Sequence, residues 1–355
     1  MNKKLTIAVL FGGQSGEHEV SLVSAQAVMA ALDPARYTVL PVGISKEGRW
    51  IAGTGAHAAL LAAADQTRLP SSLTVTAHEP GDLIENFSFF APPVPLDVVF
   101  PVLHGPMGED GTVQGLLELA GLPYVGCGVA ASAVGLDKAL MKAAFAAAGL
   151  PLLPWLLVRR SAFESEPGEI CAQIEAALRY PVFVKPANMG SSVGVGKAND
   201  QNALLAALSD AARYDRRIVV EQGIPARELE VSVLGNEEVA TSVVGEVVPS
   251  GEWYDYAAKY LHGASQITIP ASIEPALAEQ VTRLAIAAFH AIDGAGLSRV
   301  DFLLDKERGE LWLNEVNTMP GFTPISMYAK MWAASGLDYP ALLDRLVTLA
   351  LERSR

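Results

Sequence analysis

The sequence predicts an α/β fold that is divided into more than one domain. The chain has 355 residues, more than one ordinary hydrophobic core holds, and half of them are hydrophobic, which suits two or three packed domains. Two continuous apolar runs, 6–11 and 97–103, each end in a polar turn that contains glycine, and a helical pattern follows each turn. A strand, a glycine turn and a helix in this order open a unit with a parallel sheet.

The first unit places polar side chains at the ends of its strands. Apolar residues recur at helical spacing between 20 and 28, so a helix is expected there. The turn at 12–16 lacks the GxGxxG spacing of dinucleotide-binding proteins and does not support an NAD site. Ligands of open α/β sheets bind beyond the carboxyl ends of strands, so Glu17 and His104 are expected to face one cleft, although His104 could simply hydrogen-bond within its loop. Residues 45–96 mix alanine-rich and proline-rich segments, and we assign them no role.

Charge and cysteine content argue against several classes of protein. A net charge of −13 disfavours binding to nucleic acids, whose protein partners are basic. The two cysteines, Cys127 and Cys171, have no metal-ligand or CxxC spacing, which suits packing roles in a reducing compartment. The apolar start at 5–11 resembles a signal peptide, but acidic residues at 17 and 19 interrupt that pattern, and no apolar run is long enough to span a membrane. We therefore expect a soluble cytoplasmic protein.

The middle of the chain contains a candidate phosphate clamp. A stretch rich in glycine, alanine and serine at 127–135 marks a candidate boundary, and a helix is expected over 137–148. The strand 181–186 carries Lys185 near its end, and a loop rich in glycine and serine follows at 190–196. Accessible backbone N–H groups, serine hydroxyls and a lysine are the ingredients of an anion-binding site.

The loop at 190–196 is not a Walker A motif. That motif requires Gly-x-x-x-x-Gly-Lys-Ser/Thr, whereas Ser191 stands at its first glycine position and Ala198 follows Lys197. The loop also leads into a strand rather than a helix, which separates the chain from P-loop NTPases. An ordinary flexible hairpin loop is the alternative interpretation.

Two further segments suggest ligand contacts. The strand at 218–224 carries Glu221 and runs into a linker, where a carboxylate could accept hydrogen bonds from adenine or ribose, or could be ordinary surface charge. Residues 249–270 are rich in aromatic side chains and contain glycine, which indicates a lid that closes on a ligand. A helix is expected over 274–292.

A predicted β-hairpin places four polar side chains on one face. Its two apolar runs, 297–305 and 311–317, flank a three-residue loop at 307–309, whose last residue is a glycine. In this register Asp301 lies opposite Glu315, and Arg299 lies opposite Asn317. Side chains alternate between faces along a strand, so all four share one face. A two-residue turn at 308–309 would instead move Glu315 to the other face.

The two facing carboxylates require a cation. Two like charges about 4.5 Å apart repel by roughly 3 to 4 kcal/mol at an effective dielectric constant near 20. Asp, Glu and Asn supply the oxygen ligands that Mg²⁺ prefers, and Mg²⁺ is usually held by one or two carboxylates together with substrate phosphates. The alternative is a solvated hairpin face on which Arg299 serves as the counter-ion.

Together, the lysine and glycine-loop clamp, the earlier Lys138, the magnesium face and the aromatic lid describe the handling of a nucleoside triphosphate outside the P-loop class. The chain resembles ATP-grasp enzymes and, among them, the D-alanine:D-alanine ligase family. The motifs that carry this resemblance follow one another in order over nearly the whole chain, at 10–21, 104–112, 136–138, 184–194, 254–260 and 314–321.

The resemblance implies a three-domain ATP-grasp fold of the α/β (α+β) class. It places a Rossmann-like domain with a parallel sheet at 1–130, a central domain with the phosphate loop at 131–225, and a C-terminal domain at 226–355. The last domain would contain the lid loop 249–270 and the metal hairpin 297–317. ATP would lie between the central and C-terminal domains.

The resemblance also implies the ligands of ATP and metal. The residues implied for ATP are Lys138, Lys185, Ser192, Glu221, Gln222, Ile224, Glu228 and Lys259, the lysines holding the phosphates. The residues implied for two Mg²⁺ ions, which Mn²⁺ can replace, are Asp301, Glu315 and Asn317. Gln222 departs from the pattern, because many relatives carry a different polar or basic residue there.

The reaction implied is the ATP-dependent joining of two D-alanines through an acyl phosphate, for peptidoglycan synthesis. Arg299 and the N–H group of Gly321 would stabilise the tetrahedral oxyanion. Glu17 would hold the ammonium group of the first D-alanine. The other residues implied are Ser191 and Tyr260 as hydrogen-bond partners of Glu17, His104 near the first carboxylate, and Ser326 and Met327 at the second carboxylate.

Two rival functions differ from this one in substrate or class. The first is a ligase that forms an ester with D-lactate; Tyr260 argues against it, since D-lactate variants of the family generally lack a tyrosine at this lid position. The second is a non-catalytic, nucleotide-binding regulator on the same fold. The family resemblance further suggests a homodimer acting on small molecules, with neither nucleic acid nor membrane as a partner.

Overall fold

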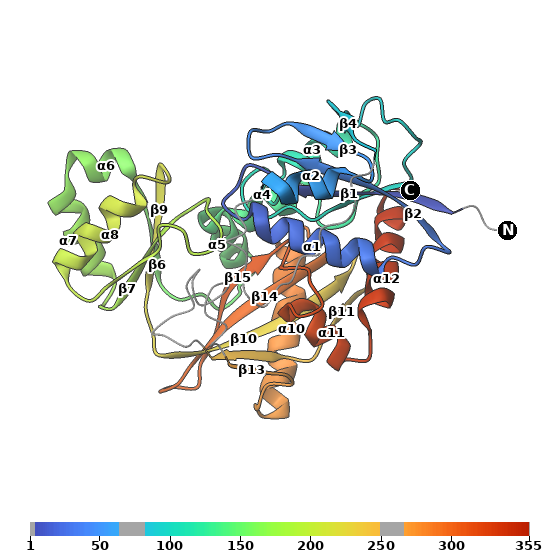
Figure 1. Cartoon of the computed structure of the whole chain (residues 1–355). Coiled ribbons are helices and arrows are strands. Elements are labelled where there is room, and N and C mark those ends of the chain that lie inside the picture. The colour runs from blue at the N-terminus through green and yellow to red at the C-terminus, as the bar shows by residue number, and fades with distance from the viewer. Residues whose placement is uncertain (1–3, 64–81, 249–265, 355) are drawn as a thin grey trace.

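The computed structural model describes residues 4–63, 82–248 and 266–354, and these form three β-sheets with helices packed on them (Figure 1). No helix within these ranges is long and apolar enough to cross a membrane.

The first sheet has a parallel centre and an antiparallel edge. Its strands, in the spatial order β4-β3-β2-β1-β5, are β1 (Leu5–Gly12), β2 (Tyr37–Ile44), β3 (Trp50–Ala52), β4 (Ile84–Glu85) and β5 (Val98–Pro101). Its helices are α1 (His18–Ala31), α2 (Ala56–Ala63) and α3 (Thr112–Leu119). Strand β1 pairs in parallel with β2 and β5, which confirms the predicted parallel unit. The antiparallel strands β3 and β4 come from 45–96, the segment to which we assigned no role.

The second sheet is antiparallel and has one face covered by helices. Its strands, in the order β6-β9-β7-β8, are β6 (Trp155–Arg159), β9 (Arg217–Gln222), β7 (Val182–Pro186) and β8 (Gly196–Ala198). The helices are α6 (Arg160–Ser165), α7 (Pro167–Ala177) and α8 (Gln201–Ala211). Val182 and Val184 point into the core beneath these helices. Because alternate residues face opposite sides, Lys185 is left for the other face, which lines a cavity.

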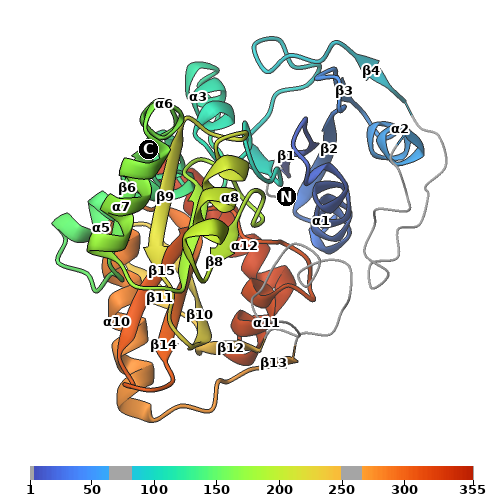
Figure 2. The ribbon, with the colours of Figure 1, turned by 90° about the vertical axis from the view of Figure 1, so that its left-hand side faces the viewer.

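The third sheet is antiparallel and packs on a long helix. Its strands, in the order β13-β12-β10-β14-β15, are β10 (Ala226–Gly235), β12 (Gly245–Val248), β13 (Gln266–Thr268), β14 (Gly296–Asp305) and β15 (Leu311–Asn317), and β11 (Val239–Thr241) pairs with β10. Helix α10 (Pro275–Ala291) lies along β10, β14 and β15 (Figure 2). Val300 and Phe302 of β14 pack into this core, so Arg299 and Asp301 face the other way.

The remaining helices join parts that are distant in the chain. Helix α4 (Val129–Leu136) adds Ala131, and helix α5 (Lys138–Ala147) adds Met141 and Phe145, to the core of the third sheet, although the sequence grouped 131–150 with the central domain. Helices α11 (Met327–Ala334) and α12 (Tyr339–Arg353) share one core with β1 of the first sheet. The C-terminal helix therefore covers the N-terminal sheet, as Figure 1 shows. The domain boundaries at 131 and 226 stay a prediction.

The metal hairpin reaches its predicted register by a different route. Asp301 lies opposite Glu315 and Arg299 lies opposite Asn317, as expected. The loop was predicted as 307–309, but it has four residues, 306–309, because the backbone N–H of Asp305 bonds to the carbonyl of Glu310 at 2.9 Å. A four-residue loop by itself would set residue 314 against Asp301. A bulge between the pairs of Asp301 and Phe302 adds one residue to β15 and restores the register.

Candidate active site

One cavity of about 440 Å³ brings the three sheets together. Every site residue named from the sequence that falls within the described residues lines it: Glu17, His104, Lys138, Lys185, Ser191, Ser192, Glu221, Gln222, Ile224, Glu228, Arg299, Asp301, Glu315, Asn317, Gly321, Ser326 and Met327. Lys259, Tyr260 and most of the predicted lid 249–270 lie outside the described residues. The end of that lid is described and forms β13, an exposed strand paired with β12.

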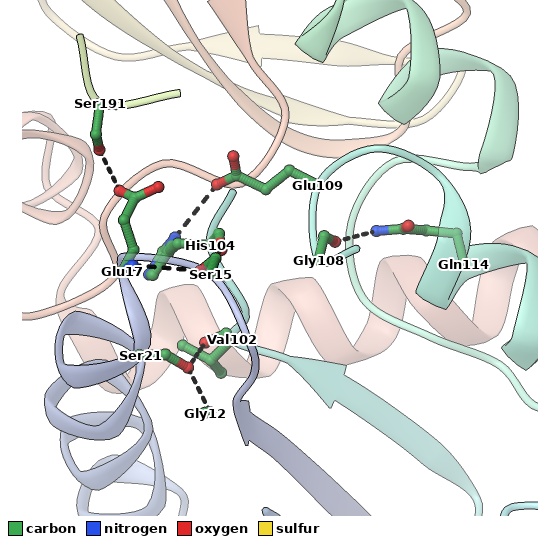
Figure 3. A network of polar contacts seen from close by, with 10 residues as sticks. All are labelled: Gly12, Ser15, Glu17, Ser21, Val102, His104, Gly108, Glu109, Gln114 and Ser191. Atoms are coloured by element: carbon green, nitrogen blue, oxygen red, sulfur yellow. Dashed lines mark hydrogen bonds and ion pairs between the residues drawn. The ribbon is translucent and has the colours of Figure 1, made fainter. Parts of the chain in front are cut away.

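The loops after β1 and β5 meet beside the first sheet (Figure 3), and Glu17 and His104 from these loops line the cavity. The Ser15 hydroxyl donates a hydrogen bond to the carbonyl of His104 at 2.6 Å and accepts one from the Glu17 N–H at 3.2 Å. Below them, the Ser21 hydroxyl accepts a hydrogen bond from the Gly12 N–H at 2.8 Å and donates one to the carbonyl of Val102. These contacts hold Glu17 and His104 at one edge of the sheet, as the sequence predicts.

Glu17 also connects the first sheet to the glycine loop of the second. The hydroxyl of Ser191 donates a hydrogen bond to Glu17 Oε1 (Figure 3). Ser191 and Ser192 have positive φ angles, +48° and +58°, in the left-handed region that costs a non-glycine residue roughly 1 to 3 kcal/mol. The loop is therefore held in a specific strained shape, which argues against an ordinary flexible hairpin loop.

His104 forms a buried pair with Glu109, a residue that the sequence analysis did not select. His104 is only 4% exposed, and its Nδ1 lies 3.3 Å from Glu109 Oε1. Burial alone would lower the pKa of His104, but the hydrogen bond and the charge of Glu109 raise it above its usual value. Burial and the nearby Glu17 raise the pKa of Glu109 as well. The signal in the sequence was the spacing of five residues within one turn, which brings both groups to the same loop.

Lys138 begins helix α5 and reaches the glycine loop. Its Nζ donates a hydrogen bond to the carbonyl of Met189 at 2.6 Å. The preceding Asp137 caps the helix, because its Oδ1 accepts hydrogen bonds from two backbone N–H groups at 3.1 and 3.0 Å. Asp137 is itself held by an ion pair with Arg217 of β9. This positions the Lys138 ammonium beside the loop of the predicted phosphate clamp.

Glu221 lies between two lysines rather than at an open surface. Its Oε2 is 3.0 Å from Lys185 Nζ, and its Oε1 is 3.2 Å from Nζ of Lys142, a residue that the sequence analysis missed. Burial would raise the pKa of Glu221, but the two ammonium groups lower it to about 2. The alternative of ordinary surface charge for Glu221 is thus wrong. Lys142 follows Lys138 by four residues, so one helix face carries both, which is the signal that could have found it.

The amide of Gln222 is occupied by backbone groups. It accepts a hydrogen bond from the Arg179 N–H at 2.8 Å and donates to the carbonyls of Arg179 at 2.7 Å and Gly223 at 3.0 Å. These bonds fasten the end of β9 to the turn before β7. Gln222 still lines the cavity, and a contact with adenosine stays a prediction.

The predicted magnesium face is a row of carboxylates across three strands. Glu230 of β10 lies opposite Asp301, which lies opposite Glu315. Arg299 joins the first two: its Nε is 3.1 Å from Glu230 Oε2, and it donates two hydrogen bonds to Asp301 at 2.7 and 2.6 Å. Burial would lower the pKa of Arg299, but the charges of Asp301 and Glu230 raise it well above its usual value. In this structure Arg299 is thus the counter-ion that the alternative interpretation named.

The donor set of this face suits a hard cation. The Asn317 amide donates a hydrogen bond to Asp301 Oδ2 at 2.9 Å, and Glu315 lies opposite Asp301 on the neighbouring strand, so the three predicted metal ligands are neighbours. In the described parts of the chain no three His, Cys, Asp or Glu side chains are grouped as a metal site. Two carboxylates and an amide agree with Mg²⁺, which completes its coordination with water and substrate phosphates.

The turn after β15 forms the far end of the cavity. The Ser326 hydroxyl accepts a hydrogen bond from the Thr323 N–H at 3.0 Å and lies 2.8 Å from the Thr323 hydroxyl. Ser326 is the residue immediately before helix α11, and Met327 begins it. The N-terminal end of a helix favours a carboxylate, as the prediction for the second substrate requires.

Comparisons with known proteins cover nearly the whole chain. Two family models match it, D-ala D-ala ligase N-terminus at residues 6–127 and D-ala D-ala ligase C-terminus at residues 144–348. The D-alanine–D-alanine ligase of Heliobacterium modesticaldum is 55% identical, over 99% of this chain and 96% of its own, and that of Chloroherpeton thalassium is 49% identical, over 99% and 98%.

Solved structures with the same fold include two ligases with different named substrates. The D-alanine-D-alanine ligase of Coxiella burnetii has a TM-score of 0.80 at 35% identity, over 99% of this chain and 95% of its own. The VanG D-Ala:D-Ser ligase of Enterococcus faecalis has a TM-score of 0.82 at 35% identity, over 98% of this chain and all of its own.

Proposed function

The chain belongs to the D-alanine–D-alanine ligase family, and we propose that the cavity between its three sheets is where it joins two D-alanines at the expense of ATP. The predicted ATP-grasp fold is confirmed. The observation that carries the assignment of the site is the convergence, on one cavity, of a carboxylate from the first sheet, lysines from α5 and the second sheet, and the carboxylate row of the third.

The lysine-rich wall would bind the phosphates of ATP. Phosphoryl transfer needs positioning and neutralisation of charge more than covalent help, so Lys138 and Lys185 beside the glycine loop suit this role. Asp301, Glu315 and Asn317 would hold Mg²⁺ or Mn²⁺, which supplies positive charge to the phosphate oxygens. Each of these groups acts from a β-strand or a helix start, which keeps its position firm.

The first half of the reaction forms an acyl phosphate. A carboxylate oxygen of the first D-alanine attacks the γ-phosphorus, and the bond to the β-phosphate breaks to release ADP. Glu17 would bind the ammonium group of this D-alanine, because Ser191 and the Ser15 loop hold its carboxylate at the cavity wall. His104, kept in orientation by Glu109, would face the substrate carboxylate.

The second half forms the peptide bond. The amine of the second D-alanine attacks the carbonyl carbon, loses a proton, and expels phosphate from the tetrahedral intermediate. Arg299 and the N–H of Gly321 would stabilise the oxyanion of that intermediate, since both line the cavity next to the metal face. The carboxylate of the second D-alanine would bind at Ser326 and Met327, at the start of α11.

The main alternative within this chemistry is a second substrate other than D-alanine. The VanG D-Ala:D-Ser ligase shares the fold as closely as the D-alanine-D-alanine ligase of Coxiella burnetii does, so the fold does not distinguish the two incoming amino acids. D-Serine is therefore the second candidate, and D-lactate, disfavoured by Tyr260, is the third.

A substrate panel tests the proposal. Phosphate release from ATP is measured with D-alanine alone and with D-alanine plus D-serine, D-lactate or L-alanine, and the product is identified by mass spectrometry. We expect release that depends on D-alanine and a D-alanyl-D-alanine product. A protein that binds ATP but shows no dependence on D-alanine would be the nucleotide-binding regulator instead.

The assembly and the compartment complete the proposal. We infer a homodimer from family resemblance, and light scattering at the working concentration checks it. A cytoplasmic location is supported by the use of ATP and by the two cysteines, Cys127 and Cys171, which are both free and buried.

A further inference from the structure

Lys142 is a buried cation to which the reaction described above gives no role. It lies one turn after Lys138 on α5 and is only 2% exposed, whereas lysine is almost never fully buried unless it is paired. Its Nζ lies 3.2 Å from Glu221 Oε1. Burial lowers the pKa of Lys142, and the charge of Glu221 opposes that effect.

The two lysines around Glu221 differ in their access to the cavity. Lys185 and Glu221 both line it, but Lys142 is not among its lining residues. Lys185 comes from β7, one strand away from Glu221 on β9, and its Nζ meets Glu221 Oε2 at 3.0 Å. Each carboxylate oxygen thus holds one ammonium group, one at the cavity and one behind its wall.

This arrangement creates a conflict when a nucleotide binds. The structure pairs Lys185 with Glu221, while the proposed function needs Lys185 at the phosphates. A buried carboxylate that loses its only cation is strongly disfavoured, so a single lysine could not serve both groups. Two lysines can serve both groups, because one of them remains paired with Glu221.

We propose, on the basis of the proposed function, that Lys142 is a positioning residue that keeps Glu221 paired from behind the wall and so releases Lys185 to the nucleotide phosphates. Lys142 itself touches neither the nucleotide nor the amino acids. Without its charge, Glu221 would retain Lys185, and the phosphates would lose that contact.

The test measures ADP affinity by calorimetry in the full-length protein. Lys142→Met is expected to weaken ADP binding about 10- to 100-fold, the range of one hydrogen bond to a charged group. The KM for ATP should rise in parallel, with little change in the KM for D-alanine. Lys306→Met, at the exposed tip of the metal hairpin, is the matched control and should bind ADP as the unmodified protein does.

A second comparison, made in the Glu221→Gln variant, distinguishes a positioning role of Lys142 from a simple loss of stability. In Glu221→Gln the carboxylate that competes for Lys185 is neutral, so adding Lys142→Met there should change ADP affinity less than about twofold. If Lys142→Met alone prevents folding, this double variant, which removes both charges of the pair, still provides the comparison with Glu221→Gln.

Three outcomes decide the matter. An unchanged ADP affinity in Lys142→Met overturns the inference, and so does an equal loss in both backgrounds, since that indicates a structural role alone. The inference is supported if Lys142→Met causes a large loss of ADP affinity when Glu221 is unchanged and no such loss in the Glu221→Gln protein. If the unmodified protein binds no ADP, the proposed function itself fails.

Discussion

Glu230 provides a sharp test of how the metal face works. It is 4% exposed, was not selected from the sequence, and pairs with Arg299 at 3.1 Å. At that distance and an effective dielectric constant near 20, the attraction is roughly 5 kcal/mol before desolvation is subtracted. Because Arg299 keeps Asp301 as a partner, we expect Glu230→Gln to lose a net amount of about 2 kcal/mol in the Glu230–Arg299 interaction.

The lost attraction has a functional consequence. With Glu230 neutral, Arg299 relies on Asp301 alone, which strengthens its hold on a predicted metal ligand. If the Arg299–Asp301 ion pair becomes more favourable by about 1 to 2 kcal/mol, Mg²⁺ competes less well for Asp301. The Mg²⁺ concentration needed for half-maximal activity then rises roughly 5- to 30-fold. Turnover is measured as phosphate release over a Mg²⁺ titration, and the thermal midpoint is recorded for the same samples.

A second, partly buried ion pair on the same sheet supplies the control. Glu246 of β12 binds Arg227 through two contacts of 2.7 Å but does not line the cavity. Glu246→Gln should lower the thermal midpoint without changing the Mg²⁺ requirement. An unchanged Mg²⁺ requirement in Glu230→Gln, or an equal change in both variants, would refute the reasoning.

Three further predictions concern single groups. Glu315→Gln should reduce turnover by two orders of magnitude or more while the thermal midpoint stays within a few degrees; near-normal phosphate release would contradict the predicted metal role. Tyr260→Phe, outside the described residues, should raise the ratio of D-alanyl-D-lactate to D-alanyl-D-alanine at neutral pH, and unchanged partitioning by mass spectrometry would remove that role. Glu221 has a pKa of about 2 in the folded protein against an ordinary 4.5, so its ion pairs contribute about 3 kcal/mol above pH 4.5 that is lost as the pH falls toward 2. Calorimetry from pH 6 to 2.5 should therefore find Glu221→Gln less acid-sensitive than the unmodified protein, and equal sensitivity would contradict the pairing.

The local elements could be predicted because their patterns are local. The apolar runs at 6–11 and 218–224 became β1 and β9, and the helical spacing at 274–292 became α10. The segment 45–96 could not be assigned, because β3 and β4 are very short and are strands only through their pairing with β2 and with each other.

The metal hairpin shows how a correct result can rest on an incorrect step. The predicted three-residue loop and the observed four-residue loop with a bulge put the same pair, Asp301 and Glu315, face to face. The alternation of β15 does mark the bulge, because buried Leu311 and Leu313 are two residues apart whereas buried Val316 follows Leu313 by three, with the polar Asn314 and Glu315 between them. The pairing of β14 with both β10 and β15 decides where the extra residue goes.

The sequence by itself determined the family and many of the residues that line the cavity, since motif spacing and strand alternation are properties of neighbouring residues. Only the tertiary structure decided which charges meet. Lys142 and Glu221 are far apart in the chain, as are Glu230 and Arg299, and each pair forms because a helix or a strand packs beside another element. Buried charges must find partners wherever packing leaves them, so the partners of Glu221 and Arg299 depend on the assembled fold.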